Sequence, residues 1–164
     1  MRCAADTNFF ISLAGHNELA LDALEVLRRE SRRFDRLATE TVLDELRYLS
    51  RQSEDARLAG WAKQALLSLE SDWQFRPTVS THAESLLIGT VSGLILSSGT
   101  LPPTERHDAR ILAESTVQGC VLVVSDDSHF RSLDKGRLDD LLRPYNLEAP
   151  VIVTAREIVR MFYH

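Results

Sequence analysis

Short apolar runs alternate with longer amphipathic segments along the whole chain, and this alternation restricts the possible folds more than any other feature. Strands are expected at residues 2–5, 36–38, 73–79, 121–124 and 151–153. The run 121–124 contains only Val and Leu, which is typical of a strand buried on both faces of a parallel sheet. Parallel strands are joined by helices that cover both faces of the sheet. The sequence therefore predicts an α/β fold with three α/β/α layers around a central parallel sheet of four to five short strands.

Helices are predicted where apolar residues recur at helical spacing between these strands. They cover residues 18–33, a segment after Thr39, residues 54–69, a segment after Ser80, residues 105–117 and residues 154–162. Thr39 and Ser80 are the expected N-caps, because a hydroxyl can accept a hydrogen bond from a free backbone amide of the first turn. No repeat or linker interrupts the pattern, so residues 1–164 are expected to form one domain.

The overall charge limits how this chain could bind nucleic acid. The formal net charge is -5, whereas proteins that hold nucleic acid through a general basic coat rely on many Lys and Arg contacts. Any such contact must be local or bridged by metal. Cys3 and Cys120 form no metal-binding motif, and neither a signal peptide nor a membrane-spanning run is evident. The sequence predicts a soluble, cytoplasmic protein without membrane attachment.

Four acidic residues stand near the ends of the predicted elements. Asp6 follows the first strand, Glu45 lies on the helix after the second, Asp108 opens a helix, and Asp127 follows the strand 121–124. Ligands of parallel sheets gather at the carboxyl ends of the strands, where these acids can meet. Crowded carboxylates raise one another's pKa and cannot all stay ionised without a cation. Oxygen ligands without His or Cys suit Mg²⁺ or Mn²⁺.

The order of these acids resembles that of the PIN-domain family. The resemblance rests on AADTNFF, which is similar to the opening PIN motif, on TETVLDEL, which is similar to the second, and on LPPTERHDARILAESTVQGCVLVVSDDSHF, which is similar to the third and fourth. It extends through the final strand and helix, and it is greatest to the VapC-like toxins of bacterial toxin–antitoxin pairs. It implies a PIN-like fold, an RNA substrate, a small antitoxin protein as partner, and a homodimer.

The resemblance also implies roles for individual residues. It implies a ribonuclease in which Asp6, Glu45, Asp108 and Asp127 bind one or two Mg²⁺ or Mn²⁺ ions, which would activate a water for phosphodiester hydrolysis. Asn8 and Ser125 match positions that support the acids by hydrogen bonds. Arg110 is a candidate for binding the substrate phosphate. Asp126 departs from the family pattern, so the fourth ligand is either Asp127, which holds the Ser-x-Asp position, or Asp126.

Several other residues have an ordinary interpretation that the sequence favours. His107 and His129 flank the acid motifs, but metal-assisted hydrolysis does not require a general acid, so no role is expected for them. A cluster of arginines could bind phosphate, but acidic residues alternate with these arginines, so we expect the cluster to be a solvated surface. The cluster comprises Arg28, Arg29, Arg32, Arg33 and Arg36. Trp61 and Trp73 are expected to pack in the core or in an interface.

Two other functional classes compete with a nuclease. The first is a catalytically silent PIN-like module that binds RNA or protein, which the complete set of four acids disfavours. The second is an unrelated α/β phosphotransfer domain, such as a receiver domain or a haloacid-dehalogenase-like phosphatase. The former would carry an acid pair near the amino terminus and the latter an Asp-x-Asp after the first strand, whereas this chain has Asp-Thr-Asn.

Overall fold

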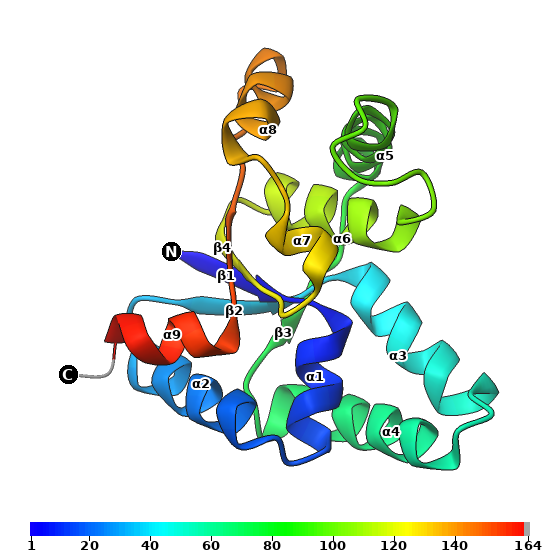
Figure 1. Ribbon diagram of the computed structural model, residues 1–164, viewed down its shortest axis with the longest axis vertical. Coiled ribbons are helices and arrows are strands. Elements are labelled where there is room, and N and C mark those ends of the chain that lie inside the picture. Colours follow the sequence, from blue (N-terminus) through cyan, green and yellow to red (C-terminus); the bar gives the residue numbers. More distant parts are fainter. Residues whose placement is uncertain (163–164) are drawn as a thin grey trace.

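The central sheet is entirely parallel within residues 1–162, which the computed structural model describes, and its strand order is β3-β2-β1-β4-β5 (Figure 1). The five strands are β1 (Arg2–Ala5), β2 (Asp35–Ala38), β3 (Arg76–Pro77), β4 (Cys120–Val124) and β5 (Val151–Val153). Each neighbouring pair runs parallel. The predicted α/β class and the number of strands are confirmed.

The helices cover both faces of this sheet. They are α1 (Thr7–Ala14), α2 (Glu18–Arg29), α3 (Glu40–Gln52), α4 (Ala56–Ser71), α5 (His82–Ser97), α6 (Arg106–Val117), α7 (Ser128–Arg131), α8 (Lys135–Leu142) and α9 (Ala155–Phe162), with a 3₁₀ turn at Arg143–Tyr145. Figure 1 shows α1, α2, α4 and α9 on one side and α5, α6 and α8 on the other, which gives the three predicted layers. Each helix among residues 1–162 is too short or too polar to cross a membrane.

Strand β1 consists mainly of small residues and occupies the middle of the sheet. Cys3, Ala4 and Ala5 are fully buried. Ala4 packs in a small cluster with residues of β2 and β4, whereas Cys3 and Ala5 belong to the larger core, as expected for side chains that alternate between the two faces. Ala5 is paired with Val124. The residues that follow β1 and β4 therefore emerge side by side at the carboxyl edge of the sheet.

An aromatic cluster fixes α1 against the segment that precedes β3. The Phe10 ring contacts Phe75 edge-on, with ring centroids 4.9 Å apart, and stacks on Trp73 at 6.1 Å. Trp61 is half-buried against the same core, and the Arg57 guanidinium lies 5.4 Å from its ring centroid. The expected packing role of both tryptophans is confirmed. Because α1 begins directly after β1, this cluster also fixes the direction in which the chain leaves the central strand.

The run 121–124 is not buried throughout, contrary to the prediction. Val121 is 39% exposed. Arg2 pairs with Cys120 and Cys3 pairs with Leu122, so Val121 has no partner in β1 and forms a bulge. A bulge leaves one residue outside the ladder and lets its side chain turn away from the face it would otherwise occupy.

The helix boundaries differ from the predictions in several places. The N-cap of α5 is Thr81 and not Ser80: the Thr81 hydroxyl accepts from the Glu84 amide while the Glu84 carboxylate accepts from the Thr81 amide. Thr39 does precede α3, but its hydroxyl makes no capping bond. The helix predicted at 18–33 ends at Arg29. Helices α1, α7 and α8 were not predicted.

The arginine cluster divides into an exposed set and one buried member. The exposed members are Arg28, Arg29, Arg32 and Arg33, and two of them pair with Glu25 and Glu30. Arg36 is only 6% exposed, and its guanidinium donates to the Leu27 carbonyl at 2.7 Å and to the Gln74 carbonyl at 3.2 Å. The expected solvated surface is therefore wrong for Arg36. Its guanidinium replaces water as the partner of these carbonyls and ties α2 to the segment before β3.

Candidate active site

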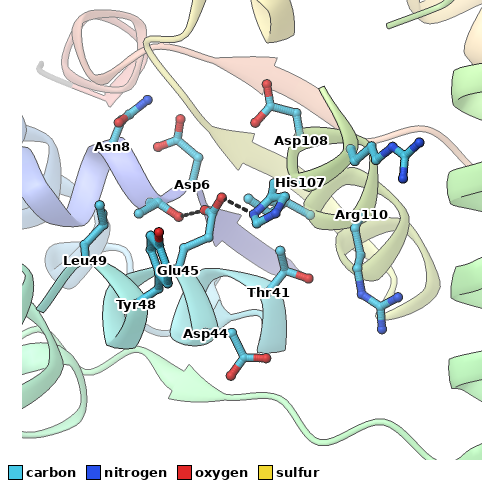
Figure 2. Close-up of a pocket in the computed structure, with 13 residues that line it drawn as sticks. Asp6, Asn8, Thr41, Asp44, Glu45, Tyr48, Leu49, His107, Asp108 and Arg110 are labelled. Carbon is cyan, nitrogen blue, oxygen red and sulfur yellow. Dashed lines mark hydrogen bonds and ion pairs between the residues drawn. The ribbon is translucent and has the colours of Figure 1, made fainter. Parts of the chain in front are cut away.

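A cleft of about 820 Å³ opens at the carboxyl edge of the sheet, between α3 and α6, and we call it the acidic cleft. Three of the predicted acids line it: Asp6, which follows β1, Glu45 on α3 and Asp108 on α6. Figure 2 shows these side chains around the cleft, with Asn8 on the adjoining turn of α1. The structure thus brings together acids that are far apart in the sequence.

Asp6 lies at the base of the cleft and is 3% exposed. It is the N-cap of α1: one carboxylate oxygen accepts from the Phe9 amide at 2.8 Å, and the other accepts from the Ser125 hydroxyl at 2.5 Å. Burial raises the pKa of Asp6 to about 7, and the charges of Asp108 and Asp126 act in the same direction, while the two hydrogen bonds oppose the rise. Asp6 is therefore a carboxylate held in place and deprived of water.

Glu45 is held by contacts to both of its carboxylate oxygens. Thr7, at the start of α1, donates its hydroxyl to Oε2. The Nδ1 atom of His107, on α6, lies 2.6 Å from Oε1 (Figure 2). His107, for which no role was expected, therefore connects α6 to α3 across the cleft.

Asp108 lies in the first turn of α6, where it is half-buried. Burial and, to a lesser extent, the negative charges of Asp127, Glu105 and Glu45 together raise the pKa of Asp108 to about 6. The positive charge that His129 can carry acts in the opposite direction. The side chains that perturb Asp108 thus come from both α3 and the segment after β4.

Asp127 and Asp126 occupy different environments after β4. Asp127 is the N-cap of α7, where its carboxylate accepts from the His129 amide at 2.7 Å, and its own amide donates to the Ser125 hydroxyl at 3.1 Å. The Ser125 hydroxyl thus connects Asp6 to the backbone of Asp127. Asp126 is exposed to solvent. Among the neighbouring charges, that of Asp127 raises the pKa of Asp108 the most.

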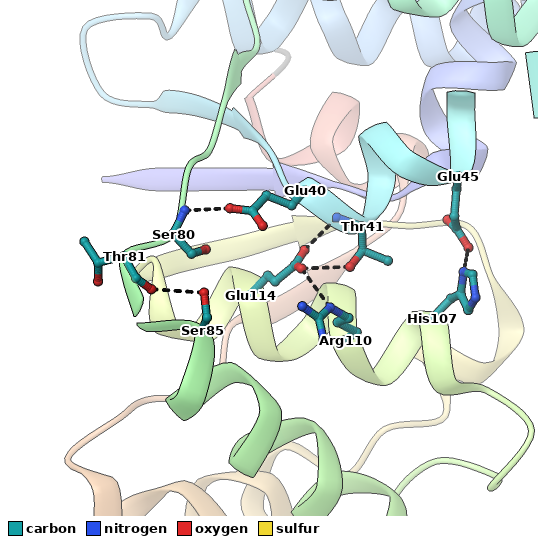
Figure 3. A network of polar contacts seen from close by, with 9 residues as sticks. All are labelled: Glu40, Thr41, Glu45, Ser80, Thr81, Ser85, His107, Arg110 and Glu114. Atoms are coloured by element: carbon teal, nitrogen blue, oxygen red, sulfur yellow. Dashed lines mark hydrogen bonds and ion pairs between the residues drawn. The ribbon is translucent and has the colours of Figure 1, made fainter. Parts of the chain in front are cut away.

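A buried carboxylate clamps α3 against α6 below the cleft. Glu114 is 1% exposed and accepts from the Thr41 amide at 3.0 Å and from the Thr41 hydroxyl at 2.7 Å (Figure 3). Arg110 lines the cleft, but its Nε atom lies 3.3 Å from Glu114. Since Thr41 precedes Glu45 by about one helical turn, this clamp sets the position of α3 relative to α6.

Three side chains beside the cleft form a group with the spacing of metal ligands. Glu105, Asp108 and His129 each offer one ligand atom, and these atoms lie within 4.8 Å of one another. Glu105 and His129 were not predicted as site residues. A Glu before a helix and a His in a four-residue helix carry no distinctive signal in the sequence. The Ser-x-Asp motif next to His129 is the one local indication of its position.

The chemistry of the donors fits a divalent cation. Asp6 and Asp108 both have a raised pKa because burial and neighbouring acids disfavour their ionised forms. A cation among these oxygens would relieve that repulsion and would favour the ionised carboxylates. Hard oxygen donors are also those that Mg²⁺ and Mn²⁺ prefer.

The parallel sheet, its helical layers and the acidic edge define a PIN-like α/β domain. Its fold is shared by solved structures that include the following two. The VapBC2 structure from Rickettsia felis, bound to a DNA fragment from their promoter, aligns over 94% of this chain and 98% of the matched chain, with a TM-score of 0.65 and 14% sequence identity. VapBC-1 from nontypeable Haemophilus influenzae aligns over 80% and 92%, with a TM-score of 0.54 and 14% identity.

These likenesses concern the fold, because the identity is low in both. Over most of its length the chain shares the fold of the matched chains in these two VapBC structures. No protein-family model and no curated protein sequence matches it.

Proposed function

We propose that this protein is a metal-dependent endoribonuclease that hydrolyses RNA phosphodiester bonds and acts as the toxin of a toxin–antitoxin pair. One observation carries the proposal: Asp6, Glu45 and Asp108 line one cleft, and burial and neighbouring negative charges raise the pKa of Asp6 and Asp108. Perturbed carboxylates in a cleft are typical of functional sites. The shared fold with VapBC structures supports the biological setting.

In the proposed mechanism, Asp6, Glu45, Asp108 and Asp127 would hold Mg²⁺ or Mn²⁺. When bound, the cation lowers the pKa of a water and stabilises the charge that develops on the phosphate oxygens. Ser125 orients Asp6 through its hydroxyl. Burial raises the pKa of Asp6 to about 7 in the metal-free protein, and a bound cation would favour the ionised carboxylate of Asp6.

The remaining parts of the site serve orientation and access. Thr7 and His107 hold the two oxygens of Glu45, so this acid needs little reorganisation before it binds. Asn8 stands at the rim, where an amide can hydrogen-bond to a ligand or to the RNA backbone. Arg110 is paired with Glu114, so it can contact a substrate phosphate either while it stays paired or by exchanging Glu114 for the phosphate.

The proposed partners follow from the shared fold and the acidity of the cleft. A small antitoxin would inhibit the enzyme by covering the acidic cleft, and the active form would be a cytoplasmic homodimer. The VapBC2 and VapBC-1 structures support the expectation of a paired antitoxin. Co-expression with the product of an adjacent short reading frame tests this partner, since the complex should survive purification.

The test of the enzymatic activity uses the purified chain, a panel of structured and unstructured RNAs, and buffers with Mn²⁺, Mg²⁺ or EDTA. Cleavage is expected with metal and not with EDTA. Asp6→Asn and Glu45→Gln should each lower the rate by about 100-fold or more, since changing only the outer partners of a metal ligand costs about 10- to 100-fold. Asp22→Asn, an exposed acid on α2, serves as the matched control and should cut at the wild-type rate.

The same assay separates the enzyme from a catalytically silent module. A silent module would bind RNA or a protein partner without metal-dependent cutting. Loss of activity in EDTA together with an equal rate for wild type and Asp6→Asn would identify a contaminating nuclease and would contradict the proposal.

A further inference from the structure

His129 faces two carboxylates that come from different parts of the chain. Its Nδ1 atom lies 3.5 Å from Asp127 Oδ1 and 3.6 Å from Glu105 Oε2. Glu105 and Asp108 each offer one carboxylate oxygen that forms a group with a ring nitrogen of His129, and these three ligand atoms lie within 4.8 Å of one another. The three polar groups around His129 therefore come from the N-terminal end of α6 and from the segment after β4.

We infer that His129 supplies a nitrogen ligand to the cation of this site, together with Asp108 and Glu105, and that this mixed donor set favours a first-row transition-metal dication such as Mn²⁺ over Mg²⁺. The inference rests on the proposed function for the presence of the cation, and it adds Glu105 and His129 to the acids that the PIN-like motifs indicate.

The spacing of the group fits ligands of one ion better than it fits direct hydrogen bonds. A charge-assisted bond between imidazole and carboxylate is about 2.7–2.9 Å long, and both His129 contacts are longer. Ligands about 2.1 Å from one ion stand about 3 Å apart when adjacent and about 4 Å apart when opposite. The three atoms lie within 4.8 Å of one another, so small side-chain rotations would bring them to the spacing of ligands around one ion.

The two histidines near the cleft differ in what they contact. His107 Nδ1 lies 2.6 Å from Glu45, within hydrogen-bond distance, so that nitrogen already has a partner. The carboxylates that face the His129 ring lie 3.5 and 3.6 Å from its Nδ1 atom, and the His129 backbone amide donates to Asp127 at 2.7 Å. The His129 side chain is also 43% exposed, which leaves a path for an ion to enter from solvent.

The preference for a transition metal follows from the nitrogen donor. Imidazole binds first-row transition metals well, whereas Mg²⁺ is a hard cation that takes oxygen ligands and dehydrates reluctantly. A centre with two carboxylates and one imidazole therefore gains more affinity for Mn²⁺ than for Mg²⁺. The acids still provide the oxygen ligands that both ions accept.

The experiment uses Mn²⁺ alone as the probe, added below one equivalent to the full-length, metal-free chain. Electron spin-echo spectroscopy detects ¹⁴N nuclei bonded to Mn²⁺, and calorimetry gives the Kd values of Mn²⁺ and Mg²⁺. We expect nitrogen coupling in the wild type and in His107→Gln, and its loss in His129→Gln. We also expect His129→Gln to raise the Kd of Mn²⁺ by about 10-fold and that of Mg²⁺ by less than about 3-fold.

The outcomes test the His129 ligand and the proposed metal site separately. Bound Mn²⁺ without nitrogen coupling, or coupling that persists in His129→Gln, overturns this inference while the proposed nuclease stands if RNA is still cut. Absence of Mn²⁺ binding to the wild type at millimolar concentration overturns the proposed metal site as well. Thermal melts by circular dichroism check that His129→Gln remains folded, as expected for a partly exposed side chain.

Discussion

Replacing Asp6 with Asn should stabilise the metal-free protein at neutral and alkaline pH. The folded state holds a proton on Asp6 more tightly than the unfolded state does, because burial raises the pKa from 3.8 to about 7. As pH rises through this window, the unfolded chain loses its proton first, so the free energy of unfolding falls. Below pH 3.8 the carboxyl is neutral in both states and the penalty is absent.

The size of the effect follows from the same two values. A rise in pKa from 3.8 to about 7 corresponds to a penalty of about 4 kcal/mol once the pH exceeds 7, at about 1.4 kcal/mol per pH unit. About 2 kcal/mol of this should appear between pH 5 and pH 7. The Asn variant lacks the penalty, but it loses part of the bonding to Ser125, about 1 kcal/mol. A net gain of about 2–3 kcal/mol is therefore expected at pH 8.

Urea denaturation followed by circular dichroism at pH 5, 6, 7 and 8, with EDTA present, measures this difference. The comparison of Asp6→Asn with wild type cancels groups that titrate alike in both proteins. Asp55→Asn is the matched control, because Asp55 is the exposed N-cap of α4 and accepts from the Arg57 amide at 2.8 Å. Its effect should stay within about 0.5 kcal/mol at every pH.

Two results would refute the reasoning. If the free energy of unfolding of wild type and Asp6→Asn changed in parallel from pH 5 to pH 8, Asp6 would not have a raised pKa. If Asp6→Asn were strongly destabilised at pH 8, the hydrogen bonds of Asp6 would outweigh its desolvation, and Asp6 would be a structural cap.

Three further predictions concern the cation and the buried polar groups. Mn²⁺ at 100 times its Kd should stabilise the wild type by about 2.7 kcal/mol, seen as a higher Tm, and an unchanged Tm would argue against a metal site. Glu114→Ala should lower the free energy of unfolding by about 2–3 kcal/mol, because the Thr41 amide and Arg110 lose their partner, whereas Glu114→Gln should cost less. Arg36→Met should cost about 2–4 kcal/mol in urea, and exposed Arg32→Met under about 0.5 kcal/mol; equal effects would contradict the buried network.

The sheet could be predicted from the sequence because its strands follow from local chemistry. Short runs of apolar residues between amphipathic segments leave few alternatives to a parallel α/β sheet. Asp6 was expected directly after the first strand, and it follows β1 as predicted. The same Asp-Thr-Asn was interpreted as a turn, although it opens α1, since an Asp that favours turns is also a good N-cap.

The buried polar residues could not be predicted, since their burial depends on tertiary neighbours. Glu114 lies on an amphipathic helix, where a Glu is ordinarily solvated, and its burial follows from the position of Thr41 on another helix. Arg36 belongs to a run of arginines that looks uniformly exposed. Helix α8 is short and contains Gly136, which weakens any helical signal.

The candidate site also contains residues that the sequence could predict and residues that it could not. The motifs indicate Asp6, Glu45 and Asp108, and the structure places all three on one cleft. Glu105 and His129 belong to no periodic pattern, and they lie near Asp108 because the N-terminal end of α6 is close to α7. The choice between Asp126 and Asp127 as the fourth ligand stays a prediction, which replacing each with Asn and measuring Mn²⁺ affinity would decide.

The shape of β3 has a consequence for how copies of this protein behave at high concentration. This strand forms one border of the sheet, yet it has only two residues, and the second is Pro77, which has no amide hydrogen to offer. Exposed sheet borders are where molecules recruit one another into cross-β aggregates. A strand of another copy could form very few backbone hydrogen bonds with this border. The short β3 therefore disfavours fibril growth on that side of the sheet.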